Sequence, residues 1–361
     1  MSPLILLAPA ALKGTHTPRQ VAEALAAGVR RAMPDAQVLA CPVADGGDGL
    51  LGVVLTPGSF REQVVVTGPL GTRVGVELGW LDAETAMIES SMACGLGLVP
   101  VEQRDPTRTT TRGVGELIWE AAERGARTVV VGLGGSATVD GGTGAARGLG
   151  WTFYDGAGAP LPEGGGGLAD LERMDPGWGE LTAKVLVLAD VATPLVGSDG
   201  AAAVFAPQKG ATKQQVERLA AGLVRLGECF ARGGRPELAT LPRGGAAGGL
   251  AAGLAFFAKA EIQSGAHWVL ERVGFDAALA RADLVITAEG RFDRTSLLGK
   301  ATGEVVRRAQ HAKKRVAVVA GAAQGLIGIH TAAGDGGMLD AAGIAALGER
   351  VTREAFGLPT A

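Results

Sequence analysis

The sequence repeats one local pattern: a short apolar run, then a loop rich in glycine and acidic residues, then a helical stretch. The clearest apolar runs are Leu4–Leu7, Thr128–Val131, Val185–Leu188 and Asp283–Thr287. Strands that alternate with helices in this way predict an α/β fold with largely parallel sheets. Ligands of such sheets bind beyond the carboxyl ends of the strands. We therefore expect a site assembled from loops that are far apart in the sequence.

Glycine is the most unusual part of the composition. It accounts for 58 of the 361 residues, which is more than twice the average share of roughly 7%. The glycines follow no three-residue period, so a collagen helix is excluded. Hydrophobic residues make up 47% of the chain, which excludes wholesale disorder.

Charge, hydropathy and cysteine content indicate which partners and which compartment to expect. The formal net charge is −3, so nothing indicates nucleic-acid binding. The longest apolar stretch, residues 244–258, is too short to predict a membrane span, and the first residues lack the basic region of a signal peptide. Cys41, Cys94 and Cys229 show no CxxC spacing and are expected to be free thiols. These features predict a cytoplasmic protein that acts on a small molecule, and they leave a homodimer open.

From Val64 onwards the spacing changes to short β-like runs separated by turns. Val64–Thr67, Val74–Trp80 and Thr85–Glu89 predict antiparallel strands. Further along, the glycine run at Gly164–Gly167 predicts a flexible surface loop.

The loop Gly132–Gly142 is the most informative segment. Successive glycines after a buried strand let backbone N–H groups face an anion, and a helix N-terminus follows. The candidate anion-binding residues in this loop are Gly134, Gly135, Ser136 and Thr138. Asp140 is predicted to hold a cation or orient a proton.

The same loop also fits a different class of enzyme. Gly132-x-Gly134-x-x-Ala137 matches a dinucleotide-binding fingerprint, and Asp155 follows at the distance expected of a ribose-binding acid. A nicotinamide-dependent dehydrogenase is therefore an alternative. It would leave the other glycine and acidic loops unexplained.

Several acidic residues follow other apolar runs. Asp45 and Asp48 lie in a glycine-rich loop, Asp190 ends one strand, and Glu289 and Asp293 follow another. A single acid at a strand end is commonly a cap or turn former. Several of them at one sheet edge predict a divalent metal site or a general base.

Basic residues lie beside glycines or in polar loops of the same kind. They are Lys13, Arg108, Lys209 and Lys300. A cation next to an accessible backbone suits a phosphate or a carboxylate. The Gly299-Lys300 pair is followed by Ala301, so it is not a Walker A loop. From the residues alone we expect an enzyme that acts on an anionic, phosphorylated small molecule, with a metal.

Eight segments, in order, resemble the bacterial glycerate kinase family. They are Ala8-Pro9-x-x-x-Lys13-Gly14, Pro42-Val-Ala-Asp45-Gly-Gly-Asp48-Gly49, Arg104-Asp-Pro106 leading to Thr109-Thr110, Gly134-Gly-Ser-Ala-Thr138-x-Asp140-Gly-Gly142, Asp190-Val-x-x-Pro194-Leu195, Phe205-x-Pro-Gln-Lys209-Gly, Gly244-x-Ala-Ala-Gly-Gly-Leu250, and Ala282-Asp-Leu-Val-Ile-Thr-x-Glu289-Gly-Arg-x-Asp293 with Gly299-Lys300.

The resemblance implies ATP-dependent phosphorylation of D-glycerate by direct in-line transfer, with Mg²⁺, and favours 2-phosphoglycerate over 3-phosphoglycerate. It implies a discontinuous Rossmann-like domain, residues 1–63 with 283–361, and an inserted α/β domain with a mixed sheet, residues 64–282. The site is expected in the cleft between them.

On this reading each candidate residue has a role. Asp190, Lys13 and Lys300 are the catalytic candidates, with Asp190 as the general base. Substrate or phosphate binding is expected of Arg108, Thr109, Gly134, Gly135, Ser136, Thr138, Asp140 and Lys209. The metal candidates are Asp45, Glu289 and Asp293.

Four short segments depart from the family pattern. Ala10-Ala11-Leu12 replaces Asp-Ser-Phe, Val139 replaces Asn, Thr111-Arg112 replaces Ser-Tyr, and Thr295-Ser296 replaces Gln-Thr. Because the first loop has lost an acid and a hydroxyl, a non-catalytic sensor on a kinase scaffold is a second alternative.

Overall fold

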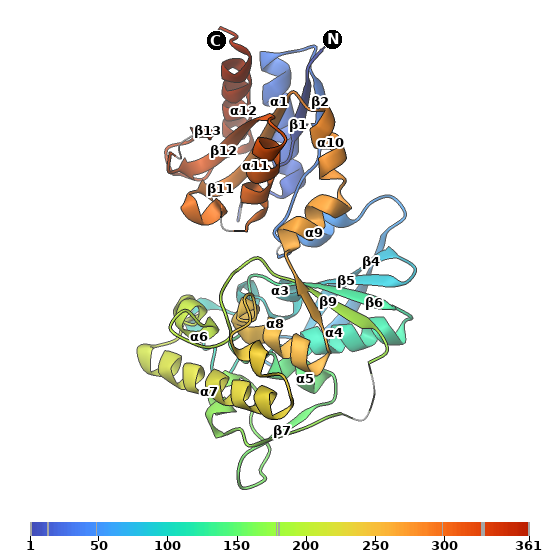
Figure 1. Cartoon of the computed structure of the whole chain (residues 1–361), viewed down its shortest axis with the longest axis vertical. Coiled ribbons are helices and arrows are strands. Elements are labelled where there is room, and N and C mark those ends of the chain that lie inside the picture. The colour runs from blue at the N-terminus through green and yellow to red at the C-terminus, as the bar shows by residue number, and fades with distance from the viewer. Residues whose placement is uncertain are drawn as a thin grey trace. The chain divides into compact units, whose positions relative to one another are not determined.

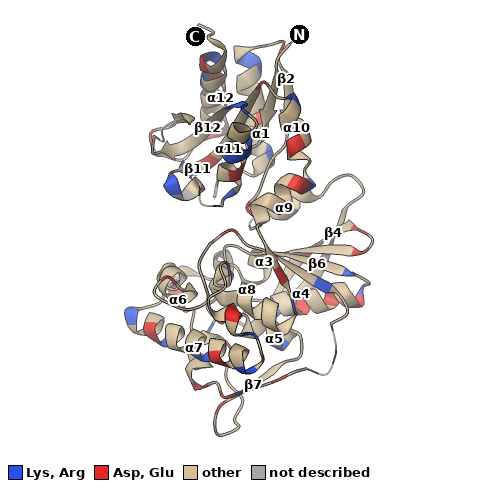
Figure 2. Ribbon diagram, in the orientation of Figure 1, with Lys and Arg blue, Asp and Glu red and all other residues tan. Residues whose placement is uncertain are grey.

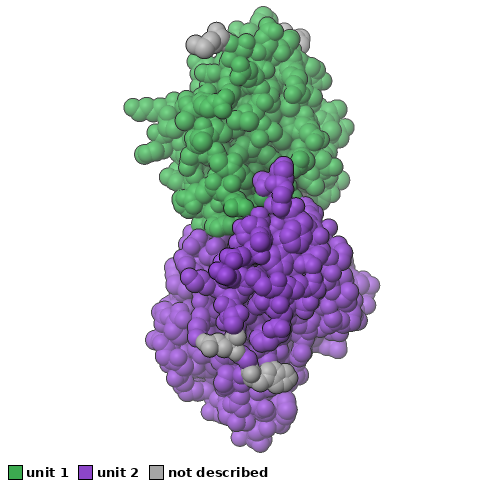
Figure 3. All heavy atoms as spheres, turned by 90° about the vertical axis from the view of Figure 1, so that its right-hand side faces the viewer, with its two compact units in different colours: residues 1–45, 52–54, 264–361 green, residues 46–51, 55–263 purple. Residues whose placement is uncertain are grey.

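The computed structural model describes residues 2–12, 14–47, 49–177, 179, 181–297, 299–325 and 329–359. The chain forms two compact units (Figure 3). Unit 1 contains residues 1–45, 52–54 and 264–361, and unit 2 contains residues 46–51 and 55–263. The domain limits expected from the sequence, and a site between the domains, stay predictions.

Unit 1 is built on a fully parallel five-stranded sheet of order β13-β12-β11-β1-β2 (Figure 1). The strands are β1 (Leu4–Leu7), β2 (Gln37–Ala40), β11 (Leu284–Phe292), β12 (Arg315–Ala323) and β13 (His330–Ala333). The helices are α1 (Pro18–Ala32), α9 (Gly265–Arg272), α10 (Phe275–Arg281), α11 (Ala301–His311) and α12 (Ala341–Phe356), with the 3₁₀ turn η6 (Arg294–Leu297).

The apolar side chains of β1 point alternately to the two faces of the sheet, and helices cover both faces. Ile5 and Leu7 pack with α1 and α12, whereas Leu4 and Leu6 pack with α9, α10 and α11. Successive side chains of a strand point to opposite faces, so a strand buried on both sides is apolar throughout. Helix α1 begins at Pro18, because the Thr17 side chain accepts a hydrogen bond from the Gln20 N–H and Pro18 occupies the first turn.

Unit 2 is built on a mixed six-stranded sheet of order β10-β9-β6-β5-β4-β3. Strands β3 (Phe60–Thr67), β4 (Arg73–Asp82) and β5 (Thr85–Glu89) are antiparallel, as the sequence predicts. Strands β5, β6 (Thr128–Gly132), β9 (Lys184–Leu188) and β10 (Glu261–Gln263) are parallel.

Helices pack around this sheet. The exposed side of helix α7 carries both positively and negatively charged residues (Figure 2). The helices are α3 (Ser90–Cys94), α4 (Arg112–Glu123), α5 (Thr143–Gly148), α6 (Ala201–Phe205), α7 (Lys213–Arg232) and α8 (Ala246–Phe257). Short elements are the 3₁₀ turns η1 (Leu96–Leu98), η2 (Val101–Gln103), η3 (Gly165–Asp170), η4 (Pro207–Lys209) and η5 (Pro236–Ala239), and the hairpin β7 (Thr152–Tyr154) with β8 (Arg173–Asp175). Helix α2 (Leu50–Val54) is divided between the two units.

Two expectations differ from the structure. The glycine run at Gly164–Gly167 is not a flexible surface loop: it enters η3, and Gly165 and Gly167 are buried. Strand β11 continues through Glu289 to Phe292, because residues up to Phe292 pair in register with β12. Glu289 therefore lies within a strand rather than in a loop.

No helix in the described part of the chain is long and apolar enough to cross a membrane.

Candidate active site

The candidate site residues of unit 2 gather where its parallel strands end. In register, Glu89 of β5 pairs with Gly132 of β6, and Gly132 pairs with Leu188 of β9. The Leu133 N–H donates to the Leu188 carbonyl, at 3.0 Å. The loop after β6 and the loop that carries Asp190 therefore start side by side. We call this end of the sheet, formed by Glu89, Gly132, Leu188 and Gln263, the carboxyl edge.

Asp140 organises the loop after β6. Its carboxylate is fully buried and accepts hydrogen bonds from the Thr111 N–H (2.9 Å), the Thr111 hydroxyl (2.8 Å), the Gly142 N–H (3.0 Å) and the Gly144 N–H (3.2 Å). Burial raises the pKa of Asp140, and these hydrogen bonds oppose the rise. The Asp140 carboxylate thus ties the end of this loop and the start of α5 to Thr111.

Lys209 is held inside the same loop. Its ammonium group donates to the Ser136 hydroxyl (2.9 Å) and the Thr138 carbonyl (2.7 Å), and the residue is 4% exposed. Burial lowers the pKa of Lys209 to about 8. Thr138 itself is fully buried beside Cys94. Lys209 and Thr138 therefore support the loop from within.

Gly134 and Gly135 form the accessible part of this loop. Gly135 is exposed and Gly134 is half-buried. Within the described chain, no hydrogen bond from either N–H is found, although the Gly135 carbonyl accepts from the Leu96 N–H at 2.7 Å. These two N–H groups can bind an anion, as the sequence predicts for them.

Glu89 is a functional candidate that the sequence analysis missed. It ends β5, is 4% exposed, and accepts hydrogen bonds from the Gly49 N–H (3.1 Å) and the Leu51 N–H (2.6 Å). Its carboxylate thereby fixes the end of the glycine-rich loop that begins at Asp45. In the sequence, Glu89 could have been singled out by its position as the last residue of a strand. That strand lies beside β6.

Asp190 lies two residues after the last residue of β9, Leu188, and is half-buried. The preceding Ala189 N–H donates to the Gln263 carbonyl of β10, at 3.0 Å. This bond fixes the backbone immediately before Asp190. The side chain thus begins at the carboxyl edge, next to the loop after β6.

Arg108 and Thr109 lie on a loop that packs against the same region. The Thr109 hydroxyl donates to the Ala137 carbonyl (2.8 Å) and the residue is 1% exposed, so Thr109 acts as a support. Arg108 is exposed. Gly164 lies so close to this loop that a Cβ there would be 2.5 Å from the Thr107 carbonyl oxygen.

A second group of candidates lies in unit 1, around Glu289. Glu289 accepts from the Ser296 hydroxyl (2.6 Å), and Lys300 Nζ lies 3.5 Å from its Oε1. Burial raises the pKa of Glu289, while Ser296 and Lys300 oppose the rise and the charge of Asp45 adds to it. Asp45 accepts from the Ala301 N–H at the start of α11. Asp293 pairs instead with Arg291, at 3.4 Å.

This arrangement fits Mg²⁺ through two carboxylates. Among the described residues no group of three or more His, Cys, Asp or Glu side chains comes together. Mg²⁺ commonly uses only one or two protein carboxylates, and its other ligands are waters and substrate phosphates. Asp45 and Glu289 are the two carboxylates of this group that could serve as such ligands. Lys13 and Asp48 lie outside the described residues.

The structure gives no support to the dinucleotide fingerprint. Asp155 is half-buried in the turn after β7, and its Oδ1 accepts from the N–H groups of Ala157 (2.9 Å) and Ala159 (2.8 Å). Strand β7 pairs with β8 in a two-stranded sheet that is separate from the sheet of β6. A ribose-binding acid should end the strand next to β6. That position belongs to β5 and β9.

A sequence model described as the glycerate kinase family matches residues 5–349. The chain belongs to the glycerate kinase family. The prediction of a kinase with an α/β fold is therefore confirmed.

Individual relatives cover most of this glycerate kinase family member. The chain is 39% identical to a glycerate 2-kinase of Escherichia coli K12 over 333 residues, 90% of this chain and 87% of that protein. It is 39% identical to a glycerate kinase of Bacillus subtilis 168 over 88% of this chain and 84% of that one. A crystal structure assigned as glycerate kinase 2 of Salmonella typhimurium LT2 matches with a TM-score of 0.82 and 37% identity over 99% of both chains.

Proposed function

We propose that this protein uses ATP to phosphorylate D-glycerate. The observation that carries the proposal is the carboxyl edge, where Asp190 and the N–H groups of Gly134 and Gly135 follow neighbouring parallel strands in register. A carboxylate at this position would serve as a base beside a loop that binds an anion, which is what phosphoryl transfer to a hydroxyl needs. The product proposed is 2-phosphoglycerate, supported by the name of the E. coli relative.

Asp190 is proposed as the general base. It would accept the proton of the attacking hydroxyl as that oxygen approaches the γ-phosphorus in line with the leaving group. Gly134 and Gly135 would donate N–H hydrogen bonds to an anionic oxygen, and Lys209 would keep the loop in that geometry from beneath. Arg108, which is exposed, is proposed to bind the glycerate carboxylate or a phosphate.

Asp45 and Glu289 are the residues proposed to hold Mg²⁺. A bound Mg²⁺ neutralises charge on phosphate oxygens. Lys300, 3.5 Å from Glu289, is proposed to bind an anionic oxygen of the nucleotide once Glu289 is engaged elsewhere. The roles assigned from the sequence to Asp293 and Lys13 stay predictions.

The cytoplasm is the proposed compartment. Cys41, Cys94 and Cys229 are free and buried, as expected of a protein that stays in a reducing compartment.

An ADP-release assay with D-glycerate and MgATP tests the proposal. Turnover that requires both substrates supports it. Absence of turnover at millimolar D-glycerate, in protein that is folded, would overturn it and favour the sensor alternative. Titration with NADH in parallel tests the dehydrogenase alternative, for which no binding is expected.

A further inference from the structure

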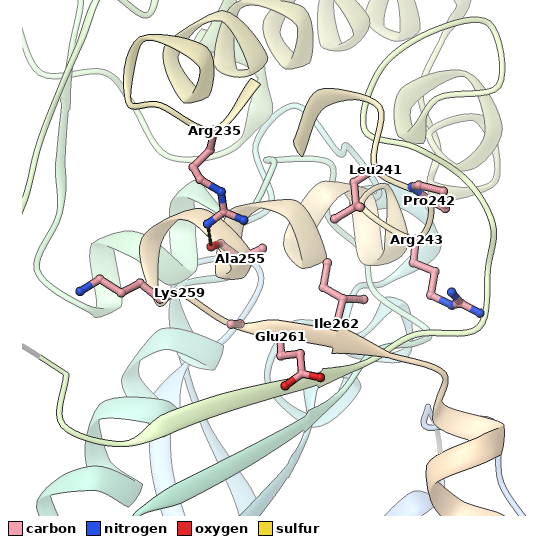
Figure 4. A pocket seen from close by; sticks show the side chains of 9 residues that line it. Arg235, Leu241, Pro242, Arg243, Ala255, Lys259, Glu261 and Ile262 are labelled. Carbon is pink, nitrogen blue, oxygen red and sulfur yellow. Dashed lines mark hydrogen bonds between the residues drawn. The ribbon is translucent and has the colours of Figure 1, made fainter. Parts of the chain in front are cut away.

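A pocket of about 540 Å³ lies in unit 2, between η5, the end of α8 and strand β10 (Figure 4). This volume lies within the roughly 300–1,000 Å³ of small-molecule sites. No residue assigned above to the candidate site lines it. Its lining includes Arg235, Leu241, Arg243, Ala255, Lys259 and Ile262.

The centre of the pocket is apolar. Figure 4 shows Ile262 and Leu241 directed toward each other, with Ala255 nearby and Glu261 directed to the other side of β10. Arg235 lies above this floor, where its guanidinium group donates to the Ala255 carbonyl at 3.4 Å. An apolar floor with a few polar groups at its margin is typical of a site for a ligand with a planar apolar part.

Strand β10 also presents an unpaired backbone edge to this pocket. It is the last strand of its sheet, with β9 as its one neighbour in the described part of the chain. The Gln263 carbonyl points to the β9 side, where it accepts from the Ala189 N–H. Because neighbouring residues of a strand direct their backbone groups to opposite edges, the N–H and C=O of Ile262 point to the outer edge. An adenine base offers an amino donor next to a ring-nitrogen acceptor, which complements this pair.

At the Arg243 end of the pocket the backbone is strained and one guanidinium nitrogen is unpaired within the described chain. Arg243 has a φ of 74°, and Lys259, at another part of the wall, has a φ of 53°. Side-chain-bearing residues adopt such angles at a cost, and they cluster at ligand sites. The Nε of Arg243 is buried and, within the described chain, lacks a hydrogen-bond partner. A buried, unpaired guanidinium nitrogen is costly unless a bound anion completes it.

Backbone hydrogen bonds connect the Arg243 end of the pocket to the loop that carries Asp190. The Gly245 N–H donates to the Thr193 carbonyl at 2.9 Å, and the Arg243 N–H approaches the Ala192 carbonyl at 3.5 Å. A Cβ on Gly245 would be 2.2 Å from the Pro194 carbonyl oxygen. A phosphate chain bound by Arg243 therefore leads toward the proposed base, and the opposite end of the pocket suits the nucleoside.

We propose that this pocket binds the adenine nucleotide of the reaction. The base lies on Leu241, Ala255 and Ile262 against the free edge of β10, and the phosphates extend past Arg243 toward the Asp190 loop. The inference rests on the proposed function for the identity of the nucleotide.

Calorimetric titration with ADP tests the pocket without any turnover. Arg243→Gly removes the guanidinium group and relieves the positive φ, so the variant should fold at least as well as the wild type. Leu241→Trp fills the apolar floor. Lys213→Ala, at an exposed position at the start of α7, is the matched control, and inorganic pyrophosphate is the probe that lacks a base.

We expect Arg243→Gly to weaken binding of both ADP and pyrophosphate at least tenfold. Leu241→Trp should weaken the binding of ADP at least tenfold and that of pyrophosphate less than twofold. The control variant should change both affinities by less than twofold. Unchanged ADP affinity in both pocket variants overturns the inference, even if the enzyme phosphorylates D-glycerate. Wild type that does not bind ADP overturns it as well. ADP binding that follows this pattern without turnover of D-glycerate supports the pocket and contradicts the proposed function.

Discussion

The ammonium group of Lys209 donates a 2.9 Å hydrogen bond to the hydroxyl of Ser136, a residue 73 positions earlier in the chain. A second bond, to the Thr138 carbonyl at 2.7 Å, makes this lysine a brace across the loop after β6. In the sequence a lysine beside a glycine suggested a phosphate ligand. Its buried side chain holds the loop for which we propose anion binding.

Replacing Lys209 with methionine should loosen this loop. The change leaves the Ser136 hydroxyl and the Thr138 carbonyl without their buried donor, at a cost of about 1–3 kcal/mol in the free energy of unfolding. Turnover should fall because Gly134 and Gly135 are no longer held. Chemical denaturation and steady-state kinetics measure the two effects, with Lys213→Ala as an exposed control. A variant with wild-type stability and activity would contradict the bracing role.

Lys209→Met also tests how the free energy of unfolding depends on pH through Lys209. The pKa of Lys209 is about 8 in the folded chain, against 10.5 for an ordinary lysine. Between these pH values the unfolded chain binds more protons, so the free energy of unfolding should rise with pH by up to about 1.4 kcal/mol per unit. Lys209→Met should lack this contribution. Parallel pH profiles of wild type and variant from pH 8 to 10 would contradict the shift.

Glu89→Gln tests the support of the glycine-rich loop. The carboxylate accepts from the N–H groups of Gly49 and Leu51, and an amide cannot accept with both of its atoms. We expect a loss of about 1–3 kcal/mol in unfolding free energy and a lower kcat/KM for both substrates. Glu123→Gln, at an exposed position near the end of α4, is the control. An effect no larger than that of the control would show that Glu89 does not position the loop.

Gly164→Ala tests the packing of the Arg108 loop. Gly164 has a φ of 87°, and a Cβ there would be 2.5 Å from the Thr107 carbonyl oxygen. Gly158 has a similar φ, 79°, with open space around it. Gly158→Ala should therefore lower the free energy of unfolding by about 1–2 kcal/mol, which is the cost of a positive φ for a residue with a Cβ. Gly164→Ala should lower it clearly more. Equal losses, measured by chemical denaturation, would contradict the close packing.

Glu289→Gln tests the proposed Mg²⁺ site. The amide keeps the shape but removes the charge that would attract a cation, so half-maximal activity should need at least tenfold more Mg²⁺. The fall in activity should be partly recovered at high Mg²⁺. An unchanged Mg²⁺ requirement, with Glu123→Gln again as control, would remove Glu289 from the metal site.

The repeated strands and their largely parallel pairing could be predicted from local pattern, because the alternation of apolar runs, glycine-rich loops and helical stretches is a local property of the sequence. The roles of Asp140, Thr109 and Lys209 could not. Each of them has a hydrogen-bond partner 28 to 73 positions away, and only the folded chain shows these long-range bonds.

Two departures from the family pattern gain a physical reading for the same reason. Thr111 donates to Asp140 through both its N–H and its hydroxyl. Ser296 donates to Glu289. Both substituted residues hold a buried carboxylate, which is a role that the sequence motif alone does not reveal.

The central claim is phosphorylation of the C2 hydroxyl of D-glycerate with Asp190 as the base. Phosphorus NMR of the product formed by the purified protein from D-glycerate and MgATP tests it most directly. We predict 2-phosphoglycerate, and a loss of about 10²–10⁴ in kcat for Asp190→Asn with unchanged thermal stability. Formation of 3-phosphoglycerate, absence of any phosphoglycerate from the wild type, or near-wild-type kcat in Asp190→Asn would contradict this proposal.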